Sequence, residues 1–256
     1  QRGLRLKNIS FAYPGNANTV LHDIEIDIAK NSSVAFVGPT GAGKSTIIDL
    51  VLGLLPPTQG SIQVDDTPLD RENIRQWQRN LGYVPQDIYL TDDTIRANIA
   101  FAIPEQAIDD AQVEHAARLA NLHDFILSLP QGYQTVVGDR GVRLSGGQRQ
   151  RIGIARALYS DPSVLVLDEA TSALDSITER AVIEAVSNLA AKKTIIMIAH
   201  RLTTVRGCDQ IYLLESGRVA AVGTYDELIQ SNKTFQELAA IGANPNSAAL
   251  PSDPCE

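Results

Sequence analysis

Cysteine is scarce in this sequence of 256 residues. The two cysteines, Cys208 and Cys255, lie far apart, and neither has the spacing of metal ligands. Two thiols also cannot form the disulfide framework of a small secreted domain. The pattern therefore excludes a cysteine-based metal module and a disulfide scaffold, and it indicates a reducing, cytosolic setting.

Long apolar segments are absent as well. No apolar run approaches the roughly 18–20 residues that a transmembrane helix needs. Residues 1–10 lack the apolar core of a signal peptide. The sequence begins at Gln1 without an initiator methionine, which predicts that it is a piece of a longer polypeptide.

Basic charge is in deficit. The formal net charge is −8 and the pI is about 5.0. Proteins that bind nucleic acid usually carry a surface stripe of basic residues, so we expect no nucleic-acid partner. A nucleotide ligand stays compatible with an acidic chain, because a phosphate site needs only local positive potential and backbone N–H groups.

The residues that are present predict an α/β fold. Hydrophobic residues make up 44% of the chain and charged residues 20%, as in a soluble protein with a sizeable core. Apolar patterning predicts strands over 4–13, 20–29, 33–38, 60–69, 81–86, 163–170, 194–200 and 210–223, and helices over 45–55, 71–80, 176–190 and 225–240. Strands that alternate with helices favour a parallel sheet with right-handed crossovers.

Two segments depart from this alternation. From about 93 to 158 the pattern is helical throughout, which predicts a helical insertion without strands. Residues 242–256 are rich in proline, serine and asparagine, and we expect a disordered tail there.

A glycine-rich segment, GPTGAGKST at 38–46, is a complete phosphate-binding loop of the form G-x-x-x-x-G-K-[ST]. Glycines let successive backbone N–H groups converge on phosphate oxygens, and the helix that follows adds its positive end. Lys44 can reach the β- and γ-phosphates, and the Ser45 hydroxyl can ligate Mg²⁺. A buried strand before the loop and a helix after it give the motif the required context.

A second glycine-rich segment, LSGGQ at 144–148, opens another helix and is also suited to holding phosphate. One nucleotide needs only one such loop. The second therefore requires a separate explanation.

Polar residues follow three of the predicted strands. Asp168 and Glu169 end one strand, where the first can hold Mg²⁺ through its water shell and the second can orient or deprotonate an attacking water. Two such acids could also serve as a helix N-cap. Gln86 and His200 end two more strands, and could reach the metal or the water from the same edge. Tyr13, before a Pro-Gly turn, could stack on an adenine ring or simply pack in the core.

Six motifs in this order resemble the nucleotide-binding domain of ATP-binding cassette (ABC) transporters. They are FAYPG, GPTGAGKST, YVPQ, LSGGQRQR, VLVLDEATSALD and IAHR. The resemblance extends over residues 4 to about 240. The resemblance implies a P-loop NTPase fold with a RecA-like core, an N-terminal antiparallel β-subdomain and an inserted helical subdomain at about 88–158. It implies one domain over 1–241, followed by the tail.

The resemblance also implies roles for individual residues. The implied catalytic positions are Lys44, Gln86, Glu169 and His200. The implied Mg²⁺ ligands are Ser45, Gln86 and Asp168. The implied ATP-binding positions are Tyr13, Gly38, Pro39, Thr40, Gly41, Ala42, Gly43, Lys44, Ser45, Thr46, Ser145, Gly146, Gly147, Gln148 and Asp175.

In such domains the LSGGQ segment binds the γ-phosphate held by another subunit, so the resemblance implies a head-to-tail dimer with two composite ATP sites. TDDTIRANIAF (91–101) and VGDRG (137–141) resemble the exporter branch, in which a membrane domain is the partner and the ATPase lies on the cytoplasmic face. Asp139 stands where a glutamate is common, which weakens its implied contact with that domain. The segment 141–159 is similar to exporters of lipid-linked oligosaccharides or polysaccharides, and multidrug exporters are also similar.

Two other functions stay open at this point. One is a soluble ABC ATPase acting on ribosomes or DNA, although tandem cassettes and long coiled-coil insertions are both missing from the sequence. The other is a non-catalytic module in which ATP only joins subunits. The presence of Glu169 and His200 speaks against it.

Overall fold

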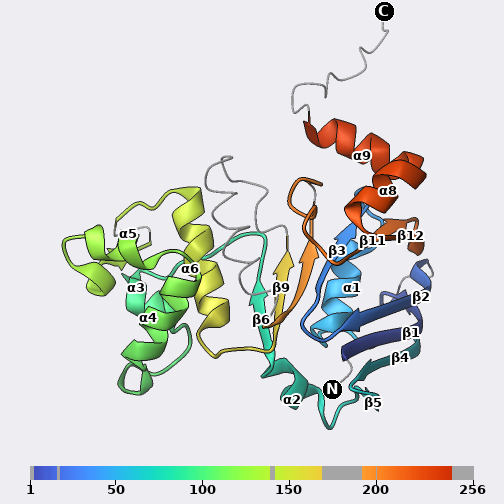
Figure 1. Cartoon of the computed structure of the whole chain (residues 1–256). Helices are drawn as coiled ribbons and strands as arrows, with labels where there is room; N and C mark the ends of the chain where they lie inside the picture. The colour runs from blue at the N-terminus through green and yellow to red at the C-terminus, as the bar shows by residue number, and fades with distance from the viewer. Residues whose placement is uncertain (1–2, 16–17, 139–141, 169–191, 200, 244–256) are drawn as a thin grey trace, which may run out of the picture.

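A computed structural model describes residues 3–15, 18–138, 142–168, 192–199 and 201–243 of the chain (Figure 1). The predicted helix at 176–190 lies outside these residues, as does the predicted tail from residue 244 on. None of the helices in the described ranges is long and apolar enough to cross a membrane.

A six-stranded sheet forms the centre of the molecule, in the order β12-β11-β3-β10-β9-β6. Its strands are β3 (Ser33–Val37), β6 (Leu81–Val84), β9 (Val164–Asp168), β10 (Thr194–Ile198), β11 (Gln210–Glu215) and β12 (Arg218–Gly223). Every neighbouring pair is parallel except β11 and β12, which form an antiparallel hairpin at one edge. The predicted parallel sheet is confirmed, and the carboxyl ends of five strands meet at one edge.

A second, antiparallel sheet has the order β2-β1-β4-β5. It comprises β1 (Gly3–Ala12), β2 (Thr19–Ala29), β4 (Gln59–Val64) and β5 (Thr67–Pro68). Along β2 apolar residues alternate with polar ones, so that one face is buried and the other is exposed. This sheet is the β-subdomain that the resemblance implied.

Helix α1 (Lys44–Val51) packs between the two sheets (Figure 1). Its buried apolar residues share one core with inward-facing residues of the antiparallel sheet and with Val164 and Val166 of β9. The intervening residues of β9, Leu165 and Leu167, belong to a different core on the other face of the central sheet. Strand β9 is therefore buried on both faces, as its unbroken apolar sequence predicts.

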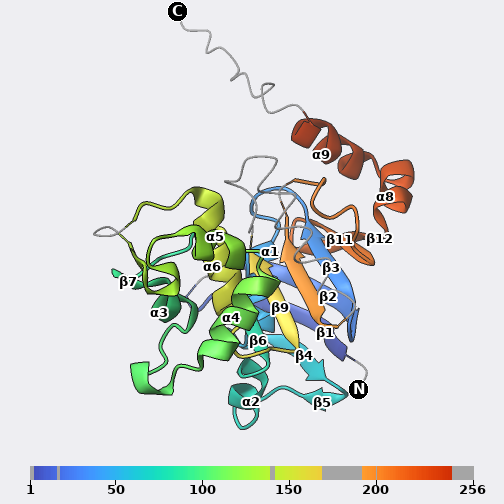
Figure 2. The ribbon, with the colours of Figure 1, turned by 60° about the vertical axis from the view of Figure 1, so that its left-hand side comes forward.

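That second core belongs to a helical lobe, which Figure 2 brings forward. Its elements are α3 (Ile95–Ile99), η1 (Glu105–Ala107), α4 (Asp110–Leu119), α5 (His123–Ser128), η2 (Gly132–Gln134) and α6 (Gly146–Leu158). The prediction of a segment without strands was wrong in one detail. A two-stranded ladder, β7 (Asp93–Thr94) with β8 (Val136–Val137), closes the lobe.

Two further predictions differ from the structure at helix ends. The helix predicted over 45–55 ends at Val51, because Gly53 adopts a left-handed conformation with φ of 67° and turns the chain away. At the C-terminus, α8 (Tyr225–Ser231) and α9 (Lys233–Ala243) replace one long helix. Helix α9 extends two residues into the predicted tail.

The elements between β4 and β6 follow the prediction more closely. The hairpin of β4 and β5 lies within 60–69, apart from its first residue, Gln59. Helix α2 (Ile74–Gln78) is shorter than the predicted 71–80. The indole of Trp77 is buried and donates a hydrogen bond to the carbonyl of Val51, which joins this segment to the end of α1.

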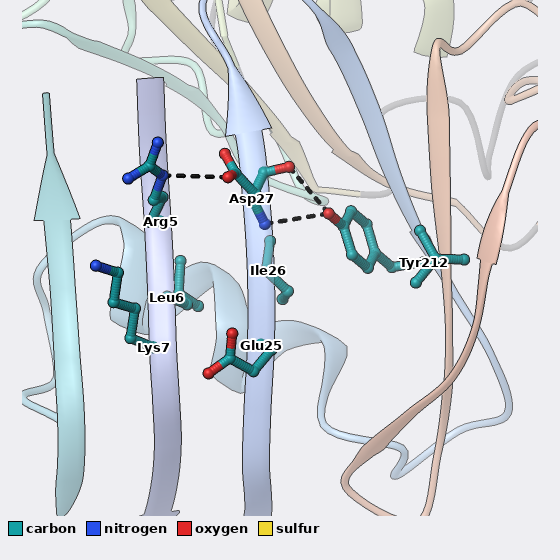
Figure 3. A pocket seen from close by; sticks show the side chains of 8 residues that line it. Arg5, Leu6, Lys7, Glu25, Ile26, Asp27 and Tyr212 are labelled. Atoms are coloured by element: carbon teal, nitrogen blue, oxygen red, sulfur yellow. Dashed lines mark hydrogen bonds and ion pairs between the residues drawn. The ribbon is translucent and has the colours of Figure 1, made fainter. Parts of the chain in front are cut away.

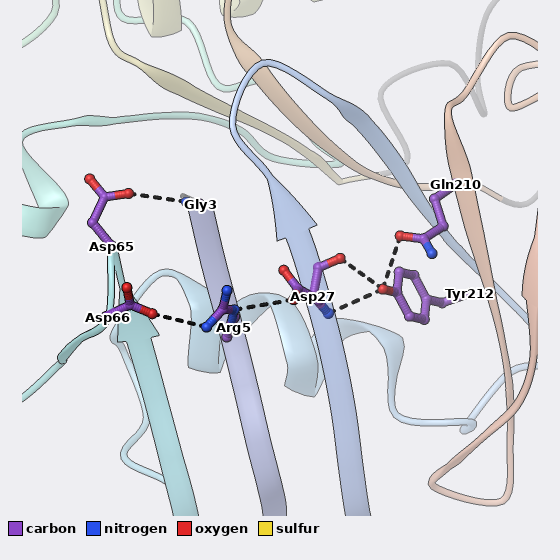
Figure 4. A network of polar contacts seen from close by, with 7 residues as sticks. All are labelled: Gly3, Arg5, Asp27, Asp65, Asp66, Gln210 and Tyr212. Carbon is purple, nitrogen blue, oxygen red and sulfur yellow. Dashed lines mark hydrogen bonds and ion pairs between the residues drawn. The ribbon is translucent and has the colours of Figure 1, made fainter. Parts of the chain in front are cut away.

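A buried tyrosine joins the antiparallel sheet to the central one (Figure 3). The Tyr212 hydroxyl donates to the carbonyl oxygen of Asp27 at 2.9 Å and accepts from the Asp27 amide at 3.1 Å. The Asp27 carboxylate accepts in turn from Arg5, whose guanidinium also contacts Asp66 (Figure 4). Because Tyr212 is 3% exposed, the two bonds of its hydroxyl to Asp27 are partly shielded from competing water. The polar chain fixes β1 and β2 relative to β11.

Candidate functional site

The phosphate loop joins β3 to α1 and has the conformation that its glycines predict. Gly38 has φ of 146°, and a Cβ there would lie 2.1 Å from the carbonyl oxygen of Leu214. Gly43 has φ of 99° at the N-cap of α1, where a Cβ would meet the side chain of Leu21. Both positions therefore require glycine, for the backbone conformation as well as for space.

The loop encloses a cavity of about 250 Å³ that opens at the N-terminus of α1. Its lining residues are Val20, Thr40, Gly41, Gly43, Lys44, Ser45 and Thr46. Two of the three loop glycines, the lysine and the hydroxyl residues predicted from the motif are thus brought together, whereas Gly38, Pro39 and Ala42 are not among the lining residues. Val20 was missed, because an apolar residue at the start of a strand gives no signal of contact with a loop that follows a different strand.

Lys44 is 5% exposed, although lysine is rarely buried without partners. Its ammonium donates to the carbonyl oxygens of Gly38 and Pro39 at 2.8 and 3.0 Å. Ser45 is exposed, so its hydroxyl is accessible at the mouth of the cavity. The positive charge and the hydroxyl are both held where a phosphate chain would enter.

Tyr13 lies beside the same helix. Its hydroxyl is 3.2 Å from the Oγ1 atom of Thr46, and its ring packs edge-on against Phe11 with centroids 4.9 Å apart. The residue is 39% exposed, so part of the ring is available for stacking. Tyr13 is therefore placed near the phosphate loop, although it does not line the cavity.

Asp168 and Gln86 lie at the carboxyl edge of the central sheet. Asp168 ends β9 opposite Ile198 of β10, and the register of β10 with β3 places it on the edge from which the phosphate loop leaves. Gln86 follows the end of β6, the neighbour of β9, by two residues and is exposed. Ligands of open α/β sheets usually bind at this edge of the sheet. Glu169, Asp175 and His200 lie outside the described residues.

Tyr83 of β6 is a residue that the sequence analysis missed. Its hydroxyl donates to a carboxylate oxygen of Asp168 at 3.3 Å across the strand pair. Burial, followed by the negative charge of Asp168, raises the pKa of Tyr83 to about 12. The phenol therefore stays protonated at neutral pH and remains a donor. Only the pairing of β6 with β9 reveals this contact, since 85 residues separate the two side chains.

The sequence predicts that Asp168 holds Mg²⁺, so replacing Tyr83 by phenylalanine is expected to weaken Mg²⁺ binding, because the Asp168 carboxylate would lose a bond that orients it. A net hydrogen-bond contribution of about 0.5–1.5 kcal/mol predicts a two- to tenfold rise in the Mg²⁺ concentration for half-maximal nucleotide binding. A Mg²⁺ titration with a fluorescent ATP analogue measures this.

Tyr225→Phe, on α8, is the matched control and is expected to leave the titration unchanged. Nucleotide binding by Tyr83→Phe in EDTA is also expected to equal that of the unmodified chain. A Mg²⁺ requirement for Tyr83→Phe equal to that of the unmodified chain would show that the hydroxyl does not orient Asp168.

The second glycine-rich segment begins α6. Ser145 is the N-cap, with its hydroxyl accepting from the Gln148 amide at 3.2 Å, and the Gln148 side chain accepts from the Ser145 amide at 2.8 Å. This capping box defines the helix start and leaves Ser145 exposed. Gly147 is buried within the first turn. The exposed helix end is suited to an anion.

The structure does not bring the two glycine-rich segments together. Helix α6 packs with the core on one face of the central sheet, and α1 packs with the core on the other face. In the sheet, β10 and β9 separate the strand that carries the phosphate loop from β6, the strand that α6 contacts. Three strand spacings amount to about 14 Å. The phosphate loop and the second glycine-rich segment of one chain are therefore too far apart to hold the same phosphate.

The donor chemistry at the sheet edge fits a magnesium ion. A serine hydroxyl, a carboxylate and an amide carbonyl are hard oxygen ligands of the kind that Mg²⁺ prefers. Ser45, Asp168 and Gln86 belong to segments that meet at this one edge. Within the described ranges no cluster of three or more histidine, cysteine, aspartate or glutamate residues forms an alternative metal site.

The sequence matches the ABC transporter family over residues 21–172. It is 44% identical over 235 residues to the ATP-dependent lipid A-core flippase of Cupriavidus metallidurans, covering 91% of this chain and 40% of that protein. It is 43% identical over 230 residues to the heterocyst differentiation ATP-binding protein HepA of a Nostoc species, covering 90% of this chain and 37% of that protein.

A solved structure of a bacterial Atm1-family ABC exporter with ATP bound superposes with a TM-score of 0.86. The sequence identity is 40%, over 95% of this chain and 42% of that one. The chain thus spans about two fifths of the length of these relatives.

Proposed function

Because the chain belongs to the ABC transporter family, with the fold of an exporter-branch nucleotide-binding domain, we propose that it binds and hydrolyses ATP to power transport across a membrane. The observation that carries this proposal is the phosphate-loop cavity with Lys44 in its wall, at the same sheet edge as Asp168. The domain extends over residues 1–241, with its helical subdomain at about 88–158.

The proposed nucleotide site is built from the first glycine-rich loop and Tyr13. Backbone amides of residues 38–46 and the end of α1 receive the phosphates, and the Lys44 ammonium contacts the β- and γ-phosphates. Tyr13 stacks on the adenine, to which its partly exposed ring is suited.

The proposed chemistry takes place where the polar residues follow the strands. Ser45, Gln86 and Asp168 hold Mg²⁺, which neutralises charge on the phosphates when it is bound. Glu169 orients the attacking water and accepts its proton, and His200 contacts the γ-phosphate. The products are ADP and phosphate.

We propose that the second glycine-rich segment completes the site of another copy. The N-terminus of α6, with residues 145–148, faces the γ-phosphate held by the partner chain, and Asp175 contacts that partner. An isologous dimer of this kind contains two composite sites related by a twofold axis. The separation of α6 from α1 by the central sheet supports this arrangement, because one chain cannot present both segments to one phosphate.

The partner in transport is a membrane domain, and the proposed location is the cytoplasmic face of the membrane. Relatives include an ATP-dependent lipid A-core flippase and an Atm1-family exporter, so export or flipping of a substrate is the proposed direction. The membrane domain would account for part of the length by which the relatives exceed this chain.

Mixing two inactive variants tests the composite site. Lys44→Ala removes the phosphate-binding cation, and Ser145→Asp adds a repelling charge while keeping a good N-cap residue. Each variant alone is expected to be inactive. In a 1:1 mixture the phosphate loop of one chain meets the α6 terminus of the other, which restores phosphate release to up to about a quarter of the unmodified rate.

The two parts of the proposal fail in different ways. An unmodified chain that releases no phosphate from ATP at any protein concentration would contradict the ATPase function. An active unmodified chain whose two variants do not complement each other would contradict the head-to-tail dimer alone. Light scattering with and without ATP gives an independent measure of the dimer.

A further inference from the structure

Arg156 occupies an unusual position on α6. It lies 11 residues after Ser145, about 16 Å along the helix, and points toward the segment that follows Gln86. Its guanidinium donates to the carbonyl oxygen of Tyr89 at 3.1 Å and to the backbone and side-chain oxygens of Asn98 at 2.9 and 3.2 Å. One side chain therefore joins α6 to two other segments.

Asn98 continues this connection. It is completely buried on α3, and its amide nitrogen donates to the carbonyl oxygens of Thr91 and Thr94 at 3.1 and 3.0 Å. Its amide oxygen accepts from both the backbone and the hydroxyl of Thr91. The turn that follows Gln86 is thus tied to Asn98, and Asn98 is tied to Arg156.

Packing at a glycine strengthens the same junction. Gly153 lies one turn before Arg156 on α6, and a Cβ there would lie 2.4 Å from the Cδ1 atom of Ile88. The helix and the segment 88–91 are therefore in close contact, without room for a methyl group unless Ile88 moves. We call residues 88–91 the post-Gln86 segment.

The chemistry of the junction requires arginine. The planar guanidinium makes three directed hydrogen bonds and lies over the ring of Phe101, 4.5 Å from its centroid. Burial lowers the pKa of Arg156 from its usual value, yet arginine stays protonated in proteins. A lysine keeps the charge but has a single nitrogen and no planar face, so it cannot reproduce this set of contacts.

We propose that Arg156 is a positioning residue that fixes the post-Gln86 segment to α6, so that Gln86 and Ser145 keep a constant relative position. The proposal rests on the proposed function, in which these residues belong to two different composite sites of the dimer. Arg156 touches neither glycine-rich segment. Its effect is therefore on assembly of the dimer rather than on the first binding of ATP. That binding takes place at the phosphate loop, and α1, which follows the loop, packs on the other face of the sheet.

Arg156→Lys in the full chain tests this proposal. We expect ATP affinity at low protein concentration to stay within twofold of the unmodified chain, because the phosphate loop is unchanged. The protein concentration for half-maximal ATP-induced dimerisation, measured by light scattering, is expected to rise fivefold or more. Hydrogen exchange of peptides covering 88–94 is expected to become faster. The Thr91 amide donates to the side-chain oxygen of Asn98, and that oxygen is no longer held in place by Arg156.

Arg151→Lys is the matched control, because Arg151 is on the same helix but donates to the carbonyl of Asn121, away from the post-Gln86 segment. It is expected to leave both dimerisation and exchange at 88–94 unchanged. Equal effects of the two variants, or normal dimerisation by a folded Arg156→Lys chain, would overturn the positioning role. Failure of the unmodified chain to bind ATP or to dimerise would instead contradict the proposed function.

Discussion

Glu169→Gln is expected to stop ATP turnover while ATP binding and dimerisation persist. Glu169 directly follows Asp168 in the sequence, and Asp168 ends β9 at the edge of the sheet from which the phosphate loop leaves. The amide is nearly the same size as the carboxylate but cannot accept a proton from water. Loss of a general base typically costs 10²–10⁴-fold, so we expect phosphate release to fall about 100-fold or more.

The dimer is the second readout of this variant. Without hydrolysis nothing separates the two chains, so ATP is expected to hold a stable dimer that light scattering detects and that ADP does not support. Glu215→Gln is the matched control, since Glu215 ends β11 in the same sheet. Hydrolysis by Glu169→Gln at a near-normal rate would refute its role as the base.

Lys44→Ala is expected to weaken nucleotide binding itself. Each hydrogen bond to a charged group contributes about 1.5–3 kcal/mol, which predicts a 10- to 150-fold loss of affinity from one such contact with the phosphates. Titration calorimetry measures this loss. The two variants are therefore expected to differ in ATP affinity, because Glu169→Gln retains binding.

The control for this variant addresses the loop. Lys44 also holds the carbonyls of Gly38 and Pro39, so its removal leaves these acceptors without the ammonium. Thermal unfolding separates a local loss of binding from a loss of the fold. Lys7→Ala on β1, outside the cavity, is expected to bind ATP normally. Unchanged ATP affinity of a folded Lys44→Ala chain would exclude contact between this lysine and the phosphates.

The elements around the phosphate loop could be predicted because their signals are local. A buried strand, a glycine loop and a helix follow one another within 33–51, and each has its own pattern. The order of strands in the sheet was not predictable in this way. Strand β10 lies between β3 and β9, and the chain reaches it only after more than 100 further residues.

Three of the contacts that sequence patterns missed join distant segments. Tyr83 meets Asp168 across 85 residues, and Arg156 meets Tyr89 across 67. Asp93 pairs with Val137 in a ladder too short to give an alternating pattern. A tyrosine or an arginine in such a position has no periodic neighbour that signals its partner, so only the assembled fold reveals it.

The burial of Lys44 has a consequence for how the site can be refilled. Its ammonium holds the phosphate loop from within, through two of the loop's own carbonyl oxygens. A loop that is already ordered in this way loses little conformational entropy when a ligand binds, and such preorganisation favours affinity. The ordered loop also keeps the shape of the binding site after a ligand dissociates. Exchange of one nucleotide for the next can then proceed without refolding of the loop.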